Sequence, residues 1–148
     1  ADAYHLTAPD PDGEGALQAI SQALEWRQTP TSSVDYINAH GTSTPLNDKT
    51  ETHAIKRVFG QHARTLAVNS TKSMIGHLLG AAGSVGAVAT LLQMQGGFVH
   101  PTINLDTPDE ACDLDYVPNV ARDRVINTAL VESFGFGGQN ACLVFRRV

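Results

Sequence analysis

Residues 78–92 read LLGAAGSVGAVATLL, and this stretch says more about the fold than any other part of the chain. No Asp, Glu, Lys or Arg occurs from Ser73 to Leu105, so a helix through it would be apolar on every side. A membrane span needs about 20 continuous apolar residues, whereas glycines interrupt this run and it stops at Gln93. The pattern therefore predicts no membrane span but a helix buried on all sides, of the kind that fills the central layer of a large fold.

Helical and extended patterns alternate along the chain on both sides of this run. Helices are predicted over residues 14–27 and 48–59, with Trp26 among the apolar positions of the first, and strands over 34–39, 66–69, 114–117, 128–134 and 141–145. Asp48, or Asn47 before it, has the character of an N-cap, with Glu51 completing a capping box and Gly60 stopping the helix. The alternation predicts an α/β layered fold with a mixed sheet.

Composition excludes several classes of protein. The 148 residues are 42% hydrophobic and 17% charged, with a net charge of −5 and no Lys/Arg cluster, which argues against disorder and against nucleic acid as a partner. Cys112 and Cys142 form no CxxC motif, and the histidines show no paired metal-ligand spacing, so neither a disulfide scaffold nor a metal site is expected. The first fifteen residues are acidic and predict no signal peptide, while the start at Ala1 suggests a processed or partial chain.

Candidate reactive groups follow the first two predicted strands. His40 and His77 lie on loops at strand ends, where open α/β sheets place their sites. His77 is expected in the first turn of the buried helix, whose dipole disfavours a charged imidazole, and a neutral histidine can donate to an oxygen that gains charge. Lys72 stands in an uncharged region and needs a partner if buried, for which Glu51 is a candidate. The alternatives are histidines that satisfy local backbone groups and a lysine at the surface.

The glycine-rich stretch Phe134–Gly138 also permits two interpretations. It is either a tight hairpin turn or a mobile loop whose backbone N–H groups approach a ligand closely, as glycines without a Cβ allow. The pattern of residues alone does not choose between a hydrolase, a transferase and a binding module.

Four segments, taken in order, resemble one family. They are NAHGTSTP at 38–45, STKSMIGHLLGAAG at 70–83, PTINL at 101–105 and SFGFGG at 133–138. In sequence and spacing they are similar to the C-terminal half of the β-ketoacyl-acyl-carrier-protein synthases that elongate acyl chains in fatty-acid synthesis. The similarity extends from Asp2-Ala3-Tyr4-His5 to the last predicted strand, and residues 1–148 are therefore expected to form one C-terminal ketoacyl-synthase domain.

The resemblance implies a thiolase-like fold of five layers, αβαβα, in which this chain is the second half and the apolar helix belongs to the central layer. It implies a cytoplasmic acyltransferase that performs a decarboxylative Claisen condensation. An acyl chain passes from acyl carrier protein to a cysteine, malonyl-acyl carrier protein loses carbon dioxide, and the resulting enolate attacks the acyl thioester.

The same resemblance implies roles for individual residues. His40 and His77 are expected to stabilise the enolate oxygen, and Lys72 to organise the two histidines. Phe136 matches a gating phenylalanine whose backbone N–H contributes to the oxyanion hole.

Thr42 and Thr44, with Thr7 as a further candidate, are expected to bind the phosphopantetheine arm. No cofactor or metal is implied beyond that arm, which belongs to the acyl carrier protein. The other implied partners are the N-terminal half and a second copy of the complete enzyme in a homodimer.

The sequence departs from the family pattern twice. The nucleophilic cysteine belongs to the N-terminal half, and neither Cys112 nor Cys142 lies in a nucleophile motif. Gly86 stands nine positions after His77, where the family usually has an acidic partner for the lysine. Two related interpretations remain, a type II polyketide ketosynthase and a non-catalytic chain-length factor. The presence of both histidines and the lysine argues against the second.

Overall fold

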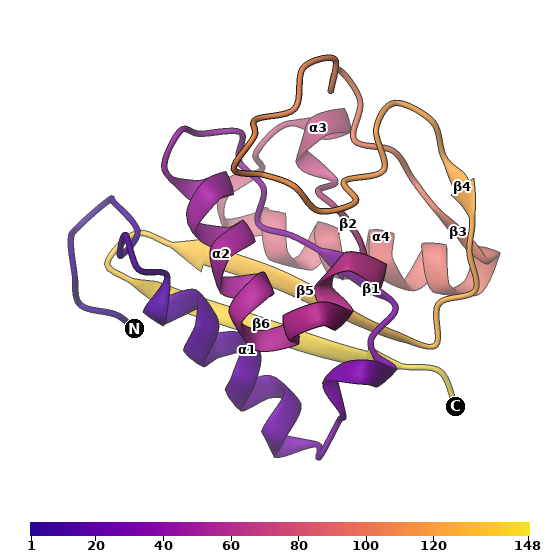
Figure 1. Cartoon of the computed structure of the whole chain (residues 1–148), viewed down its shortest axis with the longest axis horizontal. Coiled ribbons are helices and arrows are strands. Elements are labelled where there is room, and N and C mark those ends of the chain that lie inside the picture. Colours follow the sequence, from indigo (N-terminus) through magenta and orange to yellow (C-terminus); the bar gives the residue numbers. More distant parts are fainter.

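A four-stranded sheet lies at the centre of the computed structural model, which describes residues 1–148 (Figure 1). The strands are β1 (Tyr36–Asn38), β2 (Ala67–Asn69), β5 (Thr128–Gly135) and β6 (Gln139–Arg146), in the order β2-β1-β5-β6. β1 pairs in parallel with both β2 and β5, whereas β6 runs antiparallel to β5. The prediction of a mixed sheet is confirmed.

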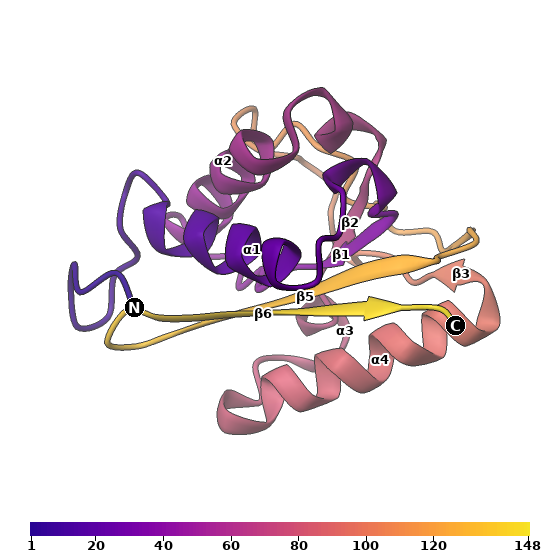
Figure 2. The same cartoon turned by 90° about the horizontal axis from the view of Figure 1, so that it is seen from below.

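Helices cover both faces of this sheet, as the view along its plane shows (Figure 2). α1 (Glu14–Trp26) and α2 (Asn47–Phe59) pack on one face, and α4 (Ala82–Gly96) packs on the other, against β5. The core between α1, α2 and the sheet includes Ile20, Leu24, Ile37, Ile55, Phe59, Val68 and Leu130. Trp26 does not join it and is 90% exposed, because its position lies well to one side of the stripe formed by Ile20 and Leu24.

The remaining elements are short. They are the 3₁₀ turns Thr31–Ser33, Gly60–Thr65 and Leu79–Ala81, the one-turn helix α3 (Lys72–Ile75), and the strands β3 (Phe98–Val99) and β4 (Arg122–Asp123), which form a separate antiparallel pair. The strand predicted over 114–117 does not form, and Asp115 makes only an isolated bridge to Ala67. Val117 has a φ of 51°, which breaks the extended conformation that a strand requires.

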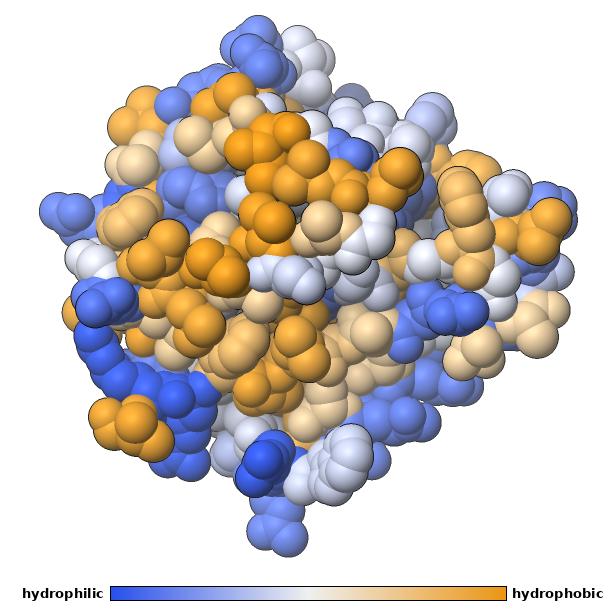
Figure 3. All heavy atoms as spheres, turned by 180° about the vertical axis from the view of Figure 1, so that it is seen from behind, coloured by the Kyte–Doolittle hydropathy of each residue, from blue (hydrophilic) through white to orange (hydrophobic).

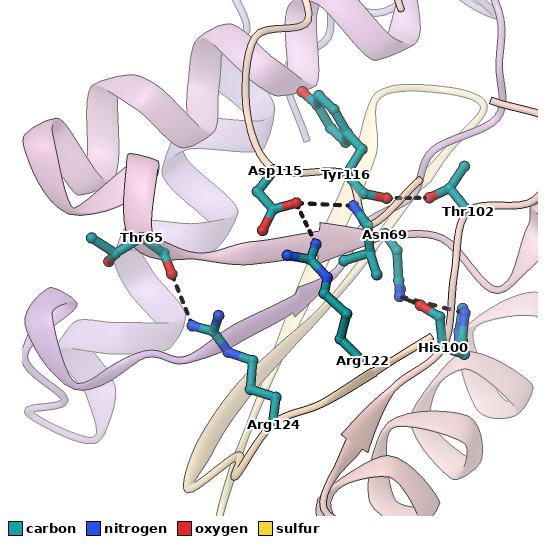
Figure 4. Close-up of polar contacts among 9 residues, drawn as sticks. Thr65, Asn69, His100, Thr102, Asp115, Tyr116, Arg122 and Arg124 are labelled. Carbon is teal, nitrogen blue, oxygen red and sulfur yellow. Dashed lines mark hydrogen bonds and ion pairs between the residues drawn. The ribbon is translucent and has the colours of Figure 1, made fainter. Parts of the chain in front are cut away.

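The long segment between β3 and β5 is held in place by side-chain contacts rather than by regular structure (Figure 4). The contacts run from Asn69 to the His100 carbonyl (2.5 Å), from Thr102 to the Tyr116 carbonyl (2.7 Å), from Arg124 to the Thr65 carbonyl (2.8 Å), and between Arg122 and Asp115. The contacts of Asn69 and Thr65 tie the segment to β2 and to the turn before it, and the other two join parts of the segment to one another.

The start of α2 differs from the prediction. The helix begins at Asn47 after Leu46, and no side chain caps it. Asp48 lies inside the first turn and accepts the Ser43 backbone N–H at 3.1 Å, so the predicted capping box does not form. The Glu51 carboxylate instead accepts backbone N–H groups from the loop after β1. Gly60 ends the helix as predicted, with a φ of 53°.

α4 begins later than predicted and is not buried on all sides. It starts at Ala82, and only Gly86, Thr90, Gln93 and Met94 are buried along its length. A single sheet covers it, so the opposite face stays open. The helix ends near Gln95 as predicted, with Gly97 in the left-handed conformation. None of the helices combines the length and the apolar character that crossing a membrane would require.

Candidate active site

Three loops meet at one edge of the sheet because three of its strands are parallel. β1 leads into His40, β2 leads into Lys72 and His77, and β5 ends at Phe134 and Gly135. The carboxyl ends of parallel strands share an edge, so residues far apart in the sequence come together there. The prediction that the two histidine loops lie at strand ends is confirmed.

His40 is buried at the centre of this edge, with 7% of its surface exposed. Its ring centroid lies 5.6 Å from that of His77 in an edge-to-face arrangement, and 5.4 Å from that of Phe134. Burial, followed by the charge of Lys72, lowers the pKa of His40 to about 3. The imidazole is therefore neutral near pH 7, and its buried Nδ1 has no hydrogen-bond partner in this chain.

His77 lies in an exposed segment between α3 and the turn at Leu79–Ala81, and not in the first turn of α4 as predicted. Gly76 and Leu79 have φ values of 77° and 51°, which interrupt any continuous helix through this point. The dipole of α4 therefore does not act on His77 in the predicted way. Its Nδ1 accepts the Leu79 backbone N–H at 3.0 Å, which places the ring proton on Nε2 and leaves that N–H free to donate.

Lys72 connects the two loops. It opens α3, and its Nζ donates to the His40 backbone carbonyl at 2.6 Å. Burial lowers the pKa of Lys72, and the charge of Glu51 acts in the opposite direction. The direct ion pair between Lys72 and Glu51 that the sequence suggested does not form. Glu51 instead accepts the backbone N–H groups of His40 at 2.6 Å and Gly41 at 2.9 Å.

Two of the three predicted threonines line a cavity of about 590 Å³ beside this edge. The hydroxyls of Thr42 and Thr44 are 3.0 Å apart in its wall, and Lys72 also lines it. Thr7 is exposed in the N-terminal segment and is not part of the wall. The structure therefore brings Thr42 and Thr44 next to the histidine site but leaves Thr7 apart from this cavity.

Phe136 lies at the tip of the β5–β6 hairpin and is 76% exposed. The turn is held by the N-terminal segment, because the Gly137 backbone N–H donates to the Leu6 carbonyl at 2.7 Å and the Asp2 backbone N–H donates to the Gly138 carbonyl at 2.9 Å. Gly137 and Gly138 have φ values of 78° and 72°, which few other residues adopt. The hairpin interpretation of this stretch is thus correct for the backbone.

Two residues that contribute to this edge are missing from the predicted site. Phe134 packs its ring on His40, and Glu132 is buried next to Glu51. The alternation of a strand gives Phe134 and Glu132 the same face as Leu130, which is a core residue. Glu132 could have been recognised in the sequence as an acidic residue at a core-facing position of a buried strand.

Both thiols of the chain are free, and neither has the surroundings of a nucleophile. Burial raises the pKa of Cys112, which lines the 590 Å³ cavity, and raises that of Cys142 in β6. A raised pKa disfavours the reactive thiolate. The chain also contains no group of three or more His, Cys, Asp or Glu side chains arranged to hold a metal ion.

Comparison with protein families and curated proteins gives one consistent result. Residues 1–106 match the family model described as the β-ketoacyl synthase C-terminal domain. The chain is 56% identical over 146 residues to 3-oxoacyl-acyl-carrier-protein synthase 2 of Synechocystis sp., and 54% identical over 147 residues to that of Coxiella burnetii. Each match covers 99% of this chain but only 35% or 36% of the relative, so the chain spans about a third of the length of these proteins.

Solved structures agree. One match is to a chain in the structure of a type II PKS acyl-carrier protein in complex with its ketosynthase bound to the hexaketide. The TM-score is 0.97 and the identity 46%, over 99% of this chain and 36% of that one. A β-ketoacyl synthase from Burkholderia phymatum matches with a TM-score of 0.93 and 38% identity, over 100% of this chain and 35% of that one. The predicted thiolase-like ketosynthase fold is confirmed.

Proposed function

Because the chain belongs to the β-ketoacyl synthase family, in which it matches the C-terminal domain, we propose that residues 1–148 are the histidine-bearing part of a condensing enzyme of fatty-acid elongation. The observation that carries this proposal is the juxtaposition of His40 and His77, 5.6 Å apart between ring centroids, with Lys72 bonded to the His40 backbone. The complete enzyme would join malonyl and acyl groups with loss of carbon dioxide.

The two histidines are suited to the decarboxylation step. When the bond between the carboxyl and the α-carbon of a malonyl thioester breaks, carbon dioxide leaves and its bonding electrons give an enolate oxygen. A neutral imidazole stabilises this oxygen by donating an N–H, and His77 has its Nε2 proton free for that purpose. His40 is held neutral and buried, so that its N–H acts in a water-poor site where a hydrogen bond is strong.

The enolate then attacks the thioester carbonyl of an acyl group carried on a cysteine, and the cysteine leaves as a thiolate. We assign that cysteine to the remainder of the longer protein, because Cys112 and Cys142 are both disfavoured as thiolates. The remainder would also cover the apolar surface of α3, α4 and the turn between them, where Leu79, Val88, Leu91 and Leu92 are exposed (Figure 3).

The acyl and malonyl groups would arrive on the phosphopantetheine arm of acyl carrier protein, with no further cofactor and no metal. The cavity beside His40 offers the hydroxyls of Thr42 and Thr44 to the amide groups of such an arm. The exposed Phe136, between glycines, would open and close access to the thioester, with its backbone N–H at the acyl oxygen. We also expect the complete enzyme to be a homodimer, which its mass in solution tests.

The direct test replaces each histidine in the complete synthase. His40→Ala and His77→Ala should each slow malonyl decarboxylation by a factor of about 10² to 10³, since an oxyanion donor contributes roughly 3 kcal/mol. Transfer of the acyl group to the cysteine, measured as covalent labelling, should fall much less. The exposed His53, replaced in the same way, is the control. Wild-type decarboxylation in both active-site variants would contradict the proposal.

A second candidate is a type II polyketide ketosynthase, favoured by the TM-score of 0.97 to such an enzyme. The identity of 56% to a fatty-acid synthase relative, against 46% to that ketosynthase, supports fatty-acid elongation instead. Offering saturated acyl primers and poly-β-keto primers to the complete enzyme separates the two. A non-catalytic chain-length factor would give no decarboxylation in any variant.

A further inference from the structure

Glu132 is a buried acid that the proposed reaction does not use. Its side chain extends from β5 into the interior, 2% of the residue is exposed, and neither carboxyl oxygen has a hydrogen-bond donor in the structure. A buried carboxylate without a donor is strongly disfavoured, because it has lost its hydration and gained nothing in exchange. The position therefore requires an explanation in terms of its neighbours.

The neighbour within hydrogen-bonding reach is another buried acid, Glu51 of α2. Glu51 accepts three donors, namely the His40 N–H at 2.6 Å, the Gly41 N–H at 2.9 Å and the Asn47 side-chain amide at 3.0 Å. Burial raises the pKa of Glu51 as well, but the three N–H donors act in the opposite direction and stabilise its carboxylate, so Glu51 is the member of the pair that keeps its charge.

The other ionisable groups near Glu132 do not remove its need for a proton. Cys142 faces it from β6, and Glu132 adds to the burial that raises the pKa of this thiol. Lys72 and Glu132 both line a small cavity of about 10 Å³. The Nζ of Lys72, however, is bonded to the His40 carbonyl, and the His40 ring is neutral. Burial and the adjacent Glu51 charge raise the pKa of Glu132 well above its usual range.

We propose that Glu132 is a positioning residue that holds a proton and donates it in a hydrogen bond to Glu51, thereby fixing the turn that carries His40. In this arrangement Glu51 receives four donors, two of which are the backbone N–H groups of His40 and Gly41. The carboxyl pair carries one negative charge, which is balanced by the ammonium of Lys72. The consequence for catalysis rests on the proposed function, whereas the shared proton does not.

The test uses the complete synthase and begins with the proton itself. Infrared spectra at neutral pH should show the band of a protonated carboxyl group, and Glu132→Gln should remove it. Glu14→Gln, at an exposed ion pair with Arg57, is the matched control and should leave the band unchanged. Absence of the band in the wild type would overturn the proposal, whether or not the protein decarboxylates malonyl thioesters.

The positioning role is tested by comparing two variants. Glu132→Gln keeps an N–H donor for Glu51, whereas Glu132→Leu of similar size does not. Decarboxylation by the Leu variant should fall roughly tenfold or more in kcat with little change in KM, and the Gln variant should regain most of this loss. Equal kcat in the two variants would overturn the role. If the Leu variant does not fold, a Gln variant that also loses tenfold in kcat would overturn it.

Discussion

At the scale of single residues, the site depends on burial at the end of a parallel sheet. His40 is enclosed by Phe134, by the loop after β2 and by the strand that leads into it, and this enclosure keeps the ring neutral. Glu132 is enclosed in the same region and keeps a proton. The two groups therefore give the folded protein opposite responses to pH.

The response of His40 is destabilisation in acid. Its pKa is about 3 in the folded protein, against roughly 6.5 when unfolded, so the unfolded state binds the extra proton between these values. The contribution is fully present above about pH 6.5 and is lost as the pH falls toward the folded value. His40→Gln should reduce the pH dependence of the free energy of unfolding by about 1.4 kcal/mol per pH unit between roughly pH 4 and 6.

The measurement is urea unfolding of the complete synthase over that pH range. His53→Gln, at an exposed position, should leave the slope unchanged. A wild-type slope in His40→Gln would mean that His40 is charged or exposed in the folded protein.

The response of Glu132 has the opposite sign. Its folded pKa lies above the unfolded value of about 4.3, so its contribution is present below that pH and is lost as the pH rises toward the folded pKa. Glu132→Gln should therefore flatten the decline of stability on the alkaline side. The same unfolding series, extended to about pH 9, checks this, and a steeper decline in the variant would contradict it.

At the scale of elements, α4 shows how a glycine inside a helix differs from the glycine that follows its last residue. A Cβ at Gly86 would meet Val131 at 3.6 Å and Asn38 at 3.8 Å, which is ordinary contact. Gly86→Ala should raise the free energy of unfolding by about 0.5–1 kcal/mol, because alanine restricts the unfolded chain and favours helix. Thermal unfolding of the complete synthase measures it.

Gly97 is the matched control for this substitution. It ends the same helix with a φ of 72°, and a Cβ added there would meet no atom within 4 Å, so only the backbone conformation opposes a side chain. Gly97→Ala should lower stability by about 1 kcal/mol. Stabilisation by both alanines would refute the conformational argument.

The β5–β6 hairpin provides a prediction about function. Phe136→Ala should slow acyl transfer to the cysteine while the melting temperature stays near the wild-type value, because the side chain is exposed and contributes little to the core. The measurement is the rate of covalent acylation in the complete synthase. Unchanged acylation would mean that the turn is only structural.

The sequence predicted helices and strands well where their bounds depend on a periodic pattern and not on tertiary contacts. α1, the end of α2 at Gly60 and the two long strands follow from periodicity and a glycine stop. The start of α2 was predicted to within one residue, but its capping box was wrong because Glu51 bonds to the loop after β1, a tertiary contact that a capping pattern cannot reveal. The start of α4 was missed because Leu79 adopts a left-handed conformation that an apolar pattern gives no reason to expect.

The candidate site divides in the same way. Motif residues such as His40, His77 and Lys72 were predicted, and the structure brings them together. Glu132 was not predicted, because its role depends on Glu51, a neighbour distant in the chain that only the packing of α2 on the sheet places beside it.

At the scale of the whole molecule, the open face of α4 determines how the chain behaves by itself. Leu91 and Leu92 are 47% and 57% exposed on a helix with no charged residue. Expressed alone, the chain should aggregate, and Leu92→Lys should increase its monodisperse fraction in light scattering. Trp26→Lys, which removes an exposed apolar residue from α1 on the other side of the sheet, should help much less. A monodisperse wild-type chain would contradict this prediction.

The pairing of β1 with β5 has a consequence for synthesis on the ribosome. Tyr36 pairs with Ala129, so β1 cannot pair with β5 until nearly all of these 148 residues have been translated. Pairings between such distant segments form slowly, because a long loop must close first. At roughly 5–20 residues per second, residues 78–92 emerge seconds before the strand that covers them. During that interval the nascent chain exposes an aggregation-prone apolar segment. A chaperone that binds residues 78–92 would raise the yield of folded enzyme.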